Sequence, residues 1–278
     1  MIIALALGSA IVFGAGDFCG GAASRRSGST GVLLLSLPTG LCLLLIVAVA
    51  LGGDATPSGL AWGAASGLAG GAGLLVFYRA LAQGPMSVVA PVSGLMAAVV
   101  PAVAGVARGD RLSVTALAGI GLCLVAICFV SIEPNKKPNG RAGAAGPLLA
   151  ALAGAGFGAF FVLIREGDDG TLWPLAASKA VGVLMVVVAA AALRTGPPLR
   201  DRVTVGVALL AGSLDVFGNA LYILAARAGM LSIAGVLSSL YPASTVLLAR
   251  LVYGERLRPI QRVGLLVAVA GVGLVTSG

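Results

Sequence analysis

The sequence contains no histidine, and only 10% of its 278 residues are charged. Without an imidazole, the chain cannot carry any histidine-dependent catalytic or metal-binding arrangement. Cysteine is also scarce, and its four copies lie inside apolar runs, at Cys19, Cys42, Cys123 and Cys128. We interpret these thiols as small buried apolar side chains, because no Cys-x-x-Cys pair is present. We therefore expect neither a metal nor another cofactor.

Apolar residues and glycine, in contrast, are abundant. Hydrophobic residues make up 59% of the chain, the mean hydropathy is +1.06, and there are 42 glycines. Spacings such as Gly63, Gly67 and Gly71 would let helix backbones approach closely in lipid, although glycine could simply be frequent here. The composition is typical of a multi-pass integral protein of the cell membrane, with membrane lipid as a partner.

Ten segments are apolar enough to cross a bilayer core, which needs about 20 residues per helix. We expect spans at Ile2–Ala23, Thr30–Leu51, Gly59–Ala82, Pro85–Ala107, Ser113–Ile132, Gly146–Arg165, Leu172–Leu193, Val203–Ala226, Met230–Val252 and Pro259–Ser277. A polar linker at 133–145 separates five spans in residues 1–132 from five in residues 146–278. Because five is odd, the second half enters the membrane from the opposite side. The sequence thus predicts an all-α polytopic membrane protein of ten transmembrane helices in two inverted five-helix repeats.

The second half of the chain also resembles the first in sequence. The matching residues, each 145 positions apart, are Gly109–Leu112 with Gly254–Leu257, Ser87 with Ser232, and Ser93 with Ser238. Weak two-fold repeats in an apolar chain are typical of transporters built from duplicated halves. Each repeated turn contains an acid, Asp110 in the first and Glu255 in the second. We expect both acids to act at helix ends, by pairing with arginines or with N-terminal amides.

The net charge of +8 does not indicate a nucleic-acid partner, because no basic stripe is interleaved with aromatic residues. The basic residues lie mostly in turns beside the apolar runs. Thirteen lie at the odd-numbered turns: Arg25, Arg26, Arg79, Lys136, Lys137, Arg141, Arg194, Arg200, Arg202, Arg250, Arg256, Arg258 and Arg262. Four lie at the even-numbered turns: Arg108, Arg111, Arg165 and Arg227. The positive-inside rule would then place both termini outside the cell.

Two charged residues are expected near the middle of the membrane. Asp215 lies about 18 Å into the eighth span, and Lys179 lies about 10 Å into the antiparallel seventh span. A lysine stem can bridge the remaining depth, and Asn219 lies one turn from Asp215 on the same helix face. Asp215 is then either a proton- or substrate-handling carboxylate that Lys179 tunes, or half of a structural ion pair between two helices.

Asp17 is expected nearer the far end of the first span, where it could pair with Arg25 and Arg26. The sequence Gly14-Ala15-Gly16-Asp17 also matches the Gly-x-Gly-Asp motif of intramembrane aspartyl proteases. Such an enzyme needs a second carboxylate at the same depth to share a proton. Asp215 is the only candidate, and we expect it to lie at a different depth.

Hydroxyl groups and prolines gather in the fourth and ninth spans. In the ninth span, Ser238, Ser239 and Tyr241 precede Pro242, and the related region of the fourth span contains Pro91, Ser93 and Pro101. Helices broken at corresponding places in two halves indicate a binding site, whereas the alternative is a packing kink. The residues that we expect at the site are Asp215, Asn219, Lys179, Tyr222, Tyr241, Ser238, Ser239 and Ser93.

The same segments resemble the EamA family of the drug/metabolite transporter superfamily. The similarity is strongest over residues 239–245, 251–257 and 261–264, and the first repeat matches through residues 78–85 and 109–113, with Asp110 where glutamate is usual. The resemblance implies ten helices around a central cavity framed by spans 1, 3, 4, 6, 8 and 9. It also implies that both termini face the cytoplasm, against the distribution of basic residues. The essential first-helix glutamate of small multidrug-resistance relatives would fall at Gly14, so this role does not transfer.

We therefore expect a secondary transporter, not an enzyme, that exports or exchanges small metabolites or drugs by alternating access, with proton coupling as an option. Its partner would be a small-molecule substrate. Two alternatives stay open: an intramembrane aspartyl protease using Asp17 and Asp215, and a non-transporting subunit of a membrane assembly. Substrate-dependent flux in vesicles would distinguish the transporter from both.

Overall fold

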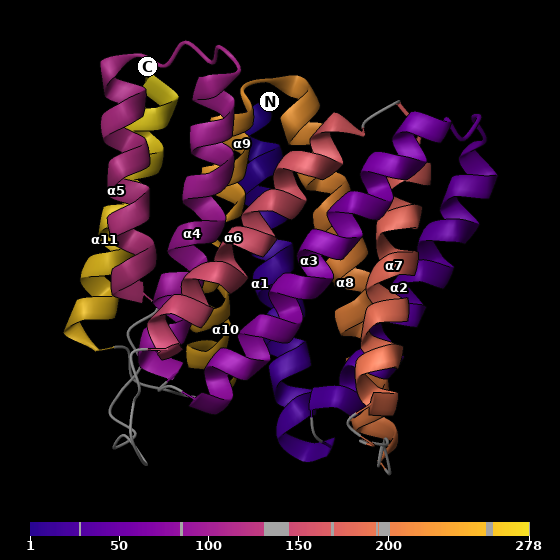
Figure 1. The fold of residues 1–278 in the computed structure, drawn as a ribbon. Coiled ribbons are helices and arrows are strands. Elements are labelled where there is room, and N and C mark those ends of the chain that lie inside the picture. Colours follow the sequence, from indigo (N-terminus) through magenta and orange to yellow (C-terminus); the bar gives the residue numbers. More distant parts are fainter. Residues whose placement is uncertain are drawn as a thin grey trace.

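The computed structural model describes residues 1–27, 29–83, 86–130, 145–167, 170–192, 194, 201–253 and 258–277, and its regular structure there is entirely helical (Figure 1). The helices are α1 (Ile2–Ser27), α2 (Ser29–Leu51), α3 (Pro57–Gln83), α4 (Met86–Ala107), α5 (Val114–Val130), α6 (Ala145–Glu166), α7 (Trp173–Ala192), α8 (Arg202–Ala228), α9 (Leu231–Ser238), α10 (Tyr241–Tyr253) and α11 (Pro259–Ser277). By length and composition, α1, α2, α3, α6, α7 and α8 could each cross a membrane. Shorter apolar segments occur in α4, α5 and α11. The all-α, polytopic prediction is confirmed.

Nine of the expected spans coincide with one helix each, but the ninth is divided into α9 and α10. The α9 helix ends in a tighter turn, in which the Leu240 N–H donates to the Leu237 carbonyl at 3.2 Å. Pro242 is the second residue of α10, where its missing N–H is tolerated. The related helix α4 is continuous although it contains Pro91 and Pro101. The prediction of a broken helix is thus correct in the second half and wrong in the first.

The main contacts between helices follow the repeat: replacing each helix by its counterpart in the other half gives a contact that is also present. Helix α1 packs against α8 and α10, and its counterpart α6 packs against α3 and α4. Helix α2 packs against α7, and α5 against α11, so these helices meet their own counterparts. In Figure 1, α1 runs away from the end that carries both termini, whereas α6 runs toward it. Neither half therefore forms a separate core.

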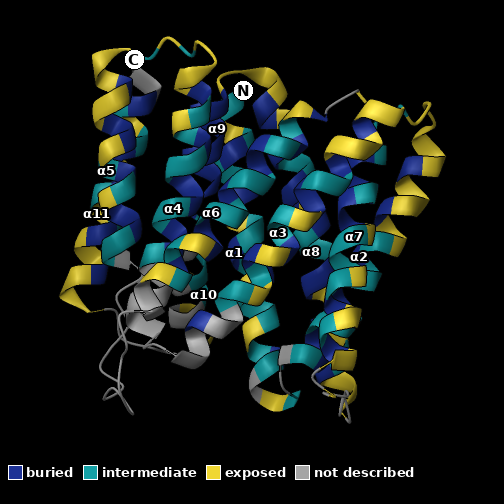
Figure 2. Ribbon diagram, in the orientation of Figure 1, coloured by how far each residue is buried: buried dark blue, intermediate teal, exposed yellow. Residues whose placement is uncertain are grey.

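Small residues allow these close contacts, as the glycine spacing predicted. In α8, a Cβ on Gly212 would overlap the backbone of Ser36 in α2. In α3, a Cβ on Gly67 would overlap the backbone of Ser178 in α7. Gly67 and Gly212 are 145 residues apart, so repeat-related glycines make repeat-related contacts. In Figure 2, the exposed residues lie mostly on the outer helices and helix ends, and the buried residues lie mostly where helices meet.

The first turns of α3 and α8 are capped at positions that the repeat relates. The Thr56 hydroxyl accepts from the Gly59 N–H at 3.0 Å, and the Asp201 carboxylate accepts from the Thr204 N–H at 3.2 Å. Positions 56 and 59 become 201 and 204 on adding 145. Two helix starts therefore keep the same type of N-cap at related positions, although the capping residues differ.

The acid in the first repeated turn also acts at a helix end. An oxygen of Asp110 accepts from the Ser232 N–H at 3.0 Å and from the Ser232 hydroxyl at 2.6 Å. Ser232 is in the first turn of α9, where free N–H groups favour a negative charge. The expected helix-end role is confirmed for Asp110. Glu255 lies outside the described residues, as does most of the expected linker at 133–145.

We expect Gly212→Ala to lower the stability of the purified protein, because its methyl group would push α8 away from α2. Overpacking of this kind costs about 1–3 kcal/mol. A matched control is Gly206→Ala in the same helix, where a Cβ would meet no atom within 4 Å. That change should leave stability unchanged or raise it by up to about 1 kcal/mol, since alanine favours the helix. Thermal unfolding in detergent measures both variants, and equal effects would contradict the packing argument.

The cap of α8 predicts an acid-dependent loss of stability. The N–H of Val203, the hydroxyl and N–H of Thr204, and the Arg26 guanidinium hold the pKa of Asp201 below its ordinary range. Because the folded pKa lies below the unfolded value of about 3.9, this stabilisation is complete above about pH 4. It is lost as pH falls through the folded pKa.

The measurement is the difference in unfolding temperature between the natural protein and Asp201→Asn, followed against pH. Asparagine keeps a capping oxygen without the charge, so the variant isolates the carboxylate. We expect the natural protein to be more stable near neutral pH, and the difference to disappear in acid below about pH 4. A difference that persists unchanged in acid would show that the charge is not involved.

Candidate functional site

The structure brings together the three residues that the sequence placed at mid-membrane. The Lys179 ammonium of α7 forms an ion pair with the Asp215 carboxylate of α8. The side-chain amide of Asn219 donates to the Asp215 carbonyl at 2.7 Å and to its carboxylate at 3.2 Å. The Lys179 side chain is 11% exposed and that of Asp215 is 38% exposed. The lysine is thus enclosed, whereas the carboxylate has open surface.

Asp17 of α1 joins this group, which the sequence analysis missed. Its side chain is exposed, and it is close enough to Asp215 and Tyr241 to interact with both electrostatically. The α1 backbone reaches the same place, because a Cβ on Gly16 would lie 3.7 Å from the Asp215 nitrogen. We call Asp17, Lys179, Asp215, Asn219 and Tyr241 the central polar group.

The expectation that Asp17 lies at a different depth from Asp215 is wrong. Helix α1 continues to Ser27, four residues beyond the expected end of the first span. At 1.5 Å per residue, Asp17 lies about 15 Å from that end of α1, and Asp215 lies about 20 Å from the adjacent start of α8. The two carboxylates are therefore at similar depths in antiparallel helices that pack together.

The proposed pairing of Asp17 with the basic turn also fails for one arginine. Arg26 lies 3.7 Å from Asp201 instead, and the Arg25 side chain is outside the described residues. No ion pair or hydrogen bond of the Asp17 side chain occurs among the described residues. The central polar group contains two carboxyl groups and one amine, so it has one more acid than base.

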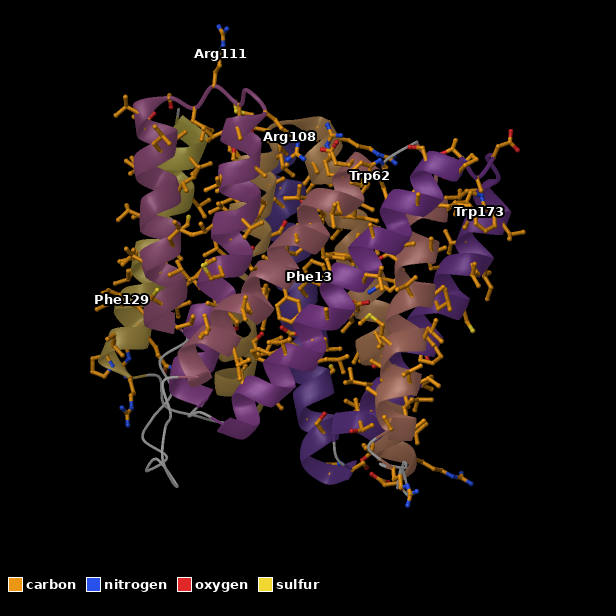
Figure 3. The ribbon with its side chains drawn as sticks, in the orientation of Figure 1. Phe13, Trp62, Arg108, Arg111, Phe129 and Trp173 are labelled. Carbon is orange, nitrogen blue, oxygen red and sulfur yellow. The ribbon has the colours of Figure 1, made fainter. Side chains whose placement is uncertain are left out.

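The other expected site residues are buried in helix contacts. The Tyr222 hydroxyl donates to the Phe161 carbonyl at 2.9 Å, and the two rings lie 4.5 Å apart. Phe161 also meets Phe13 of α1, which lies near mid-height of the bundle in Figure 3. Tyr222 is fully buried, so in this conformation it joins α6 to α8 and has no surface open to a solute.

The serines around the α9–α10 break are enclosed as well. Ser238 is fully buried and its hydroxyl donates to the Ala6 carbonyl of α1 at 3.4 Å. Ser239 is fully buried, and Ser93 in α4 is 3% exposed. The Ser239 hydroxyl and the Asn219 side-chain oxygen have no hydrogen-bond partner among the described residues. An unsatisfied buried polar atom costs about 1–3 kcal/mol, so these two atoms are available for a further contact.

The side chains of the central polar group could bind a solute or take up and release a proton. Among the described residues, no cluster of three cysteine, aspartate or glutamate side chains could hold a metal ion. The four cysteines are free thiols. The two aspartates are near each other, but Asp215 is bound by Lys179 and Asn219, and no hydrogen bond to Asp17 occurs among the described residues. A catalytic dyad that shares one proton needs such a bond.

The helices and the central polar group define a polytopic membrane protein with charged side chains between two related halves. A profile of the EamA-like transporter family matches residues 1–132 and again residues 144–277. The two matches together cover nearly the whole chain, and the chain belongs to the EamA-like transporter family. This finding agrees with the resemblance to the drug/metabolite transporter superfamily.

A solved crystal structure, described only as that of a protein, has a TM-score of 0.77 to this chain at 17% sequence identity. The superposition covers 99% of this chain and 96% of that chain. At this identity the likeness shows a shared fold and says nothing of substrate. None of the curated proteins matches this chain.

The ion pair predicts unequal effects of its two single neutralisations. Asp215→Asn would leave the enclosed Lys179 ammonium without its partner, which costs about 3 kcal/mol at such sites. Lys179→Met would leave a carboxylate with 38% of its surface exposed, so the loss of stability should be smaller. Thermal unfolding of both variants tests this order.

The double variant Lys179→Met/Asp215→Asn provides the control for that comparison. Because neither charge is left alone, we expect it to recover most of the stability lost in Asp215→Asn. Additive losses in the double variant would show that the two charges are not coupled in the folded protein.

Proposed function

We propose that the protein is a secondary transporter that exports or exchanges a small solute across the cell membrane by alternating access. The proposal rests on membership of a transporter family and on helix contacts that are related by exchange of the two halves. Residues 1–132 and 146–278 would form two inverted five-helix repeats joined by the linker at 133–145. The opposite directions of α1 and α6 support this inversion (Figure 1).

The central polar group is the observation that carries the proposal. Charged side chains at the middle of a membrane helix are costly and occur chiefly where a protein handles ions or substrates. Here α1, α7 and α8 each supply one such charge at adjoining positions. Open surface on both carboxylates gives a solute or a proton access to them.

The charge balance suggests how the group would work. Lys179 neutralises Asp215, which leaves Asp17 as the uncompensated charge. A proton or a positively charged part of a solute would remove the repulsion between Asp17 and Asp215. Binding at this position could then change the Lys179–Asp215 pair, which joins α7 to α8. Asp215 and Lys179 would be the coupling pair, and Asn219 and Tyr241 would add hydrogen bonds to the solute.

The substrate class that fits these side chains is a small polar or amphipathic metabolite or drug. Carboxylates, an amide and a phenol can bind amines and hydroxyls, while the surrounding helices are apolar. Asn219, Ser238, Ser239, Ser93 and Tyr222 would contact the solute only after a rearrangement, because they are buried in this conformation. We propose no cofactor and no catalytic activity.

An intramembrane aspartyl protease is the second candidate, and the proximity of Asp17 to Asp215 is the observation in its favour. The Lys179–Asp215 pair argues against it, because a protonated dyad cannot have one member committed to an ammonium. Cleavage of a transmembrane peptide that is lost in both Asp17→Asn and Asp215→Asn would support the protease. Intact peptide together with solute flux would support the transporter.

We expect Asp17→Asn to abolish coupling without destabilising the fold. Asp17 forms no ion pair among the described residues and repels Asp215, so neutralising it should leave unfolding temperature unchanged or raised. Transport should fall by tenfold or more, equivalent to about 1.4 kcal/mol or more of lost interaction. A thermal-shift screen against metabolite pools identifies a ligand, and vesicle flux of that ligand then gives the rate.

Asp54→Asn is the matched control, because Asp54 is an exposed aspartate in the turn between α2 and α3. It should transport like the natural protein. The stable double variant Lys179→Met/Asp215→Asn should lose transport or its pH dependence. Retained, pH-dependent flux in both Asp17→Asn and the double variant would exclude the proposed mechanism, and absent flux in every protein would favour a non-transporting subunit.

A further inference from the structure

The basic residues of this chain are distributed very unequally between the two ends of the helix bundle. We call the end that carries both termini and the α4–α5 turn the termini end, and the other the opposite end (Figure 1). Thirteen of the 18 basic residues belong in sequence to turns at the opposite end, and four belong to turns at the termini end. The remaining one is Lys179 in the central polar group.

The described arginines at the opposite end are all exposed. They are Arg26 at the end of α1, Arg194 after α7, Arg202 at the start of α8, Arg258 before α11, and Arg262 in the first turn of α11. Only Arg26 forms a described ion pair, with Asp201 at 3.7 Å, and its side chain is still 63% exposed. Among the described residues of this end, the guanidinium groups of Arg194, Arg202, Arg258 and Arg262 are therefore free to meet lipid headgroups.

At the termini end, three of the four arginines, Arg108, Arg165 and Arg227, interact with other groups of the protein. Arg108 pairs with Glu166 at 3.1 Å, and Arg165 donates to the Ala226 carbonyl at 3.2 Å. Arg111 is exposed and points away from the bundle in Figure 3. Acidic residues are also present here, including Asp54 and Asp110. This end consequently offers little free positive charge.

We infer that the opposite end lies against the anionic cytoplasmic leaflet and that both termini face the outside of the cell. Basic residues in short loops near membrane spans are retained on the cytoplasmic side, and the membrane's anionic lipids attract them. Every turn here except the linker is short, which is the condition under which the rule applies. The resemblance to the family implies the reverse orientation, with both termini in the cytoplasm. The charge distribution of this chain therefore predicts an orientation opposite to that of the family.

The inference does not depend on transport and is tested by cysteine accessibility in intact cells. The four native cysteines are replaced with alanine, and one exposed turn arginine is replaced at each end, as Arg111→Cys or Arg258→Cys. Each variant loses one arginine, so the two are matched. A membrane-impermeant maleimide should label Arg111→Cys in intact cells, and should label Arg258→Cys only after the cells are opened.

Fusions of the otherwise natural full-length chain give a second measurement that does not alter any turn. Alkaline phosphatase, which is active only outside the cytoplasm, should be active at the C terminus. A fluorescent protein that folds only in the cytoplasm should be dark there. The inverse result in both experiments would overturn the inference. Comparable labelling of both cysteines in intact cells, with both reporters active, would also overturn it, because the protein would then insert in two orientations.

Discussion

The structure depends on close contact between helix backbones of opposite halves, which glycine makes possible. In lipid, burial of apolar surface does not by itself drive helices together, so packing at small residues must contribute. Gly212 allows α8 to touch α2, Gly67 allows α3 to touch α7, and Gly154 brings α6 against the backbone of Ser93 in α4. All three contacts join one half of the chain to the other. The halves thus complete each other's packing.

This interlocking determines where charges can lie. Because α1 packs on α8, Asp17 reaches Asp215, and because α7 lies within reach of α8, Lys179 reaches the same carboxylate. Asp17 and Asp215 meet only through a contact between the two halves, whereas Lys179 and Asp215 lie on consecutive helices of the second half. Relative movement of the two halves would therefore change distances within the central polar group directly, without any intermediate element.

Sequence reasoning predicted the helices well and the site in part. Hydropathy and turns located nine helices to within a few residues, since a membrane span has a nearly fixed length. Depth along antiparallel helices correctly joined Lys179 to Asp215. The same reasoning misplaced Asp17, because a four-residue error at the end of α1 shifts depth by about 6 Å. A longer first helix would have brought the two aspartates to within about 5 Å of the same depth.

Sequence could not separate open side chains from enclosed ones. Tyr222 and Tyr241 both appeared as phenols in apolar helices, yet Tyr222 is fully buried against Phe161 and Tyr241 is partly exposed. Likewise, prolines occur in both α4 and the ninth span, but only the latter is divided. The outcome depends on the neighbouring helix: Pro101 is fully buried and packs against Gly235 of α9, a contact that exists only in the folded bundle.

The repeat also explains why the site is not symmetric although the fold is. Subtracting 145 from Lys179, Asp215 and Asn219 gives Leu34, Gly70 and Leu74, and adding 145 to Asp17 gives Val162. Each charged or amide group therefore has an apolar or glycine counterpart in the other half. The contacts that hold the helices together are kept in both halves, as Gly67 and Gly212 show. Packing thus constrains both halves equally. The charged residues, in contrast, are needed only once, at the junction of the halves, because a second set would double the cost of burying charge in the membrane.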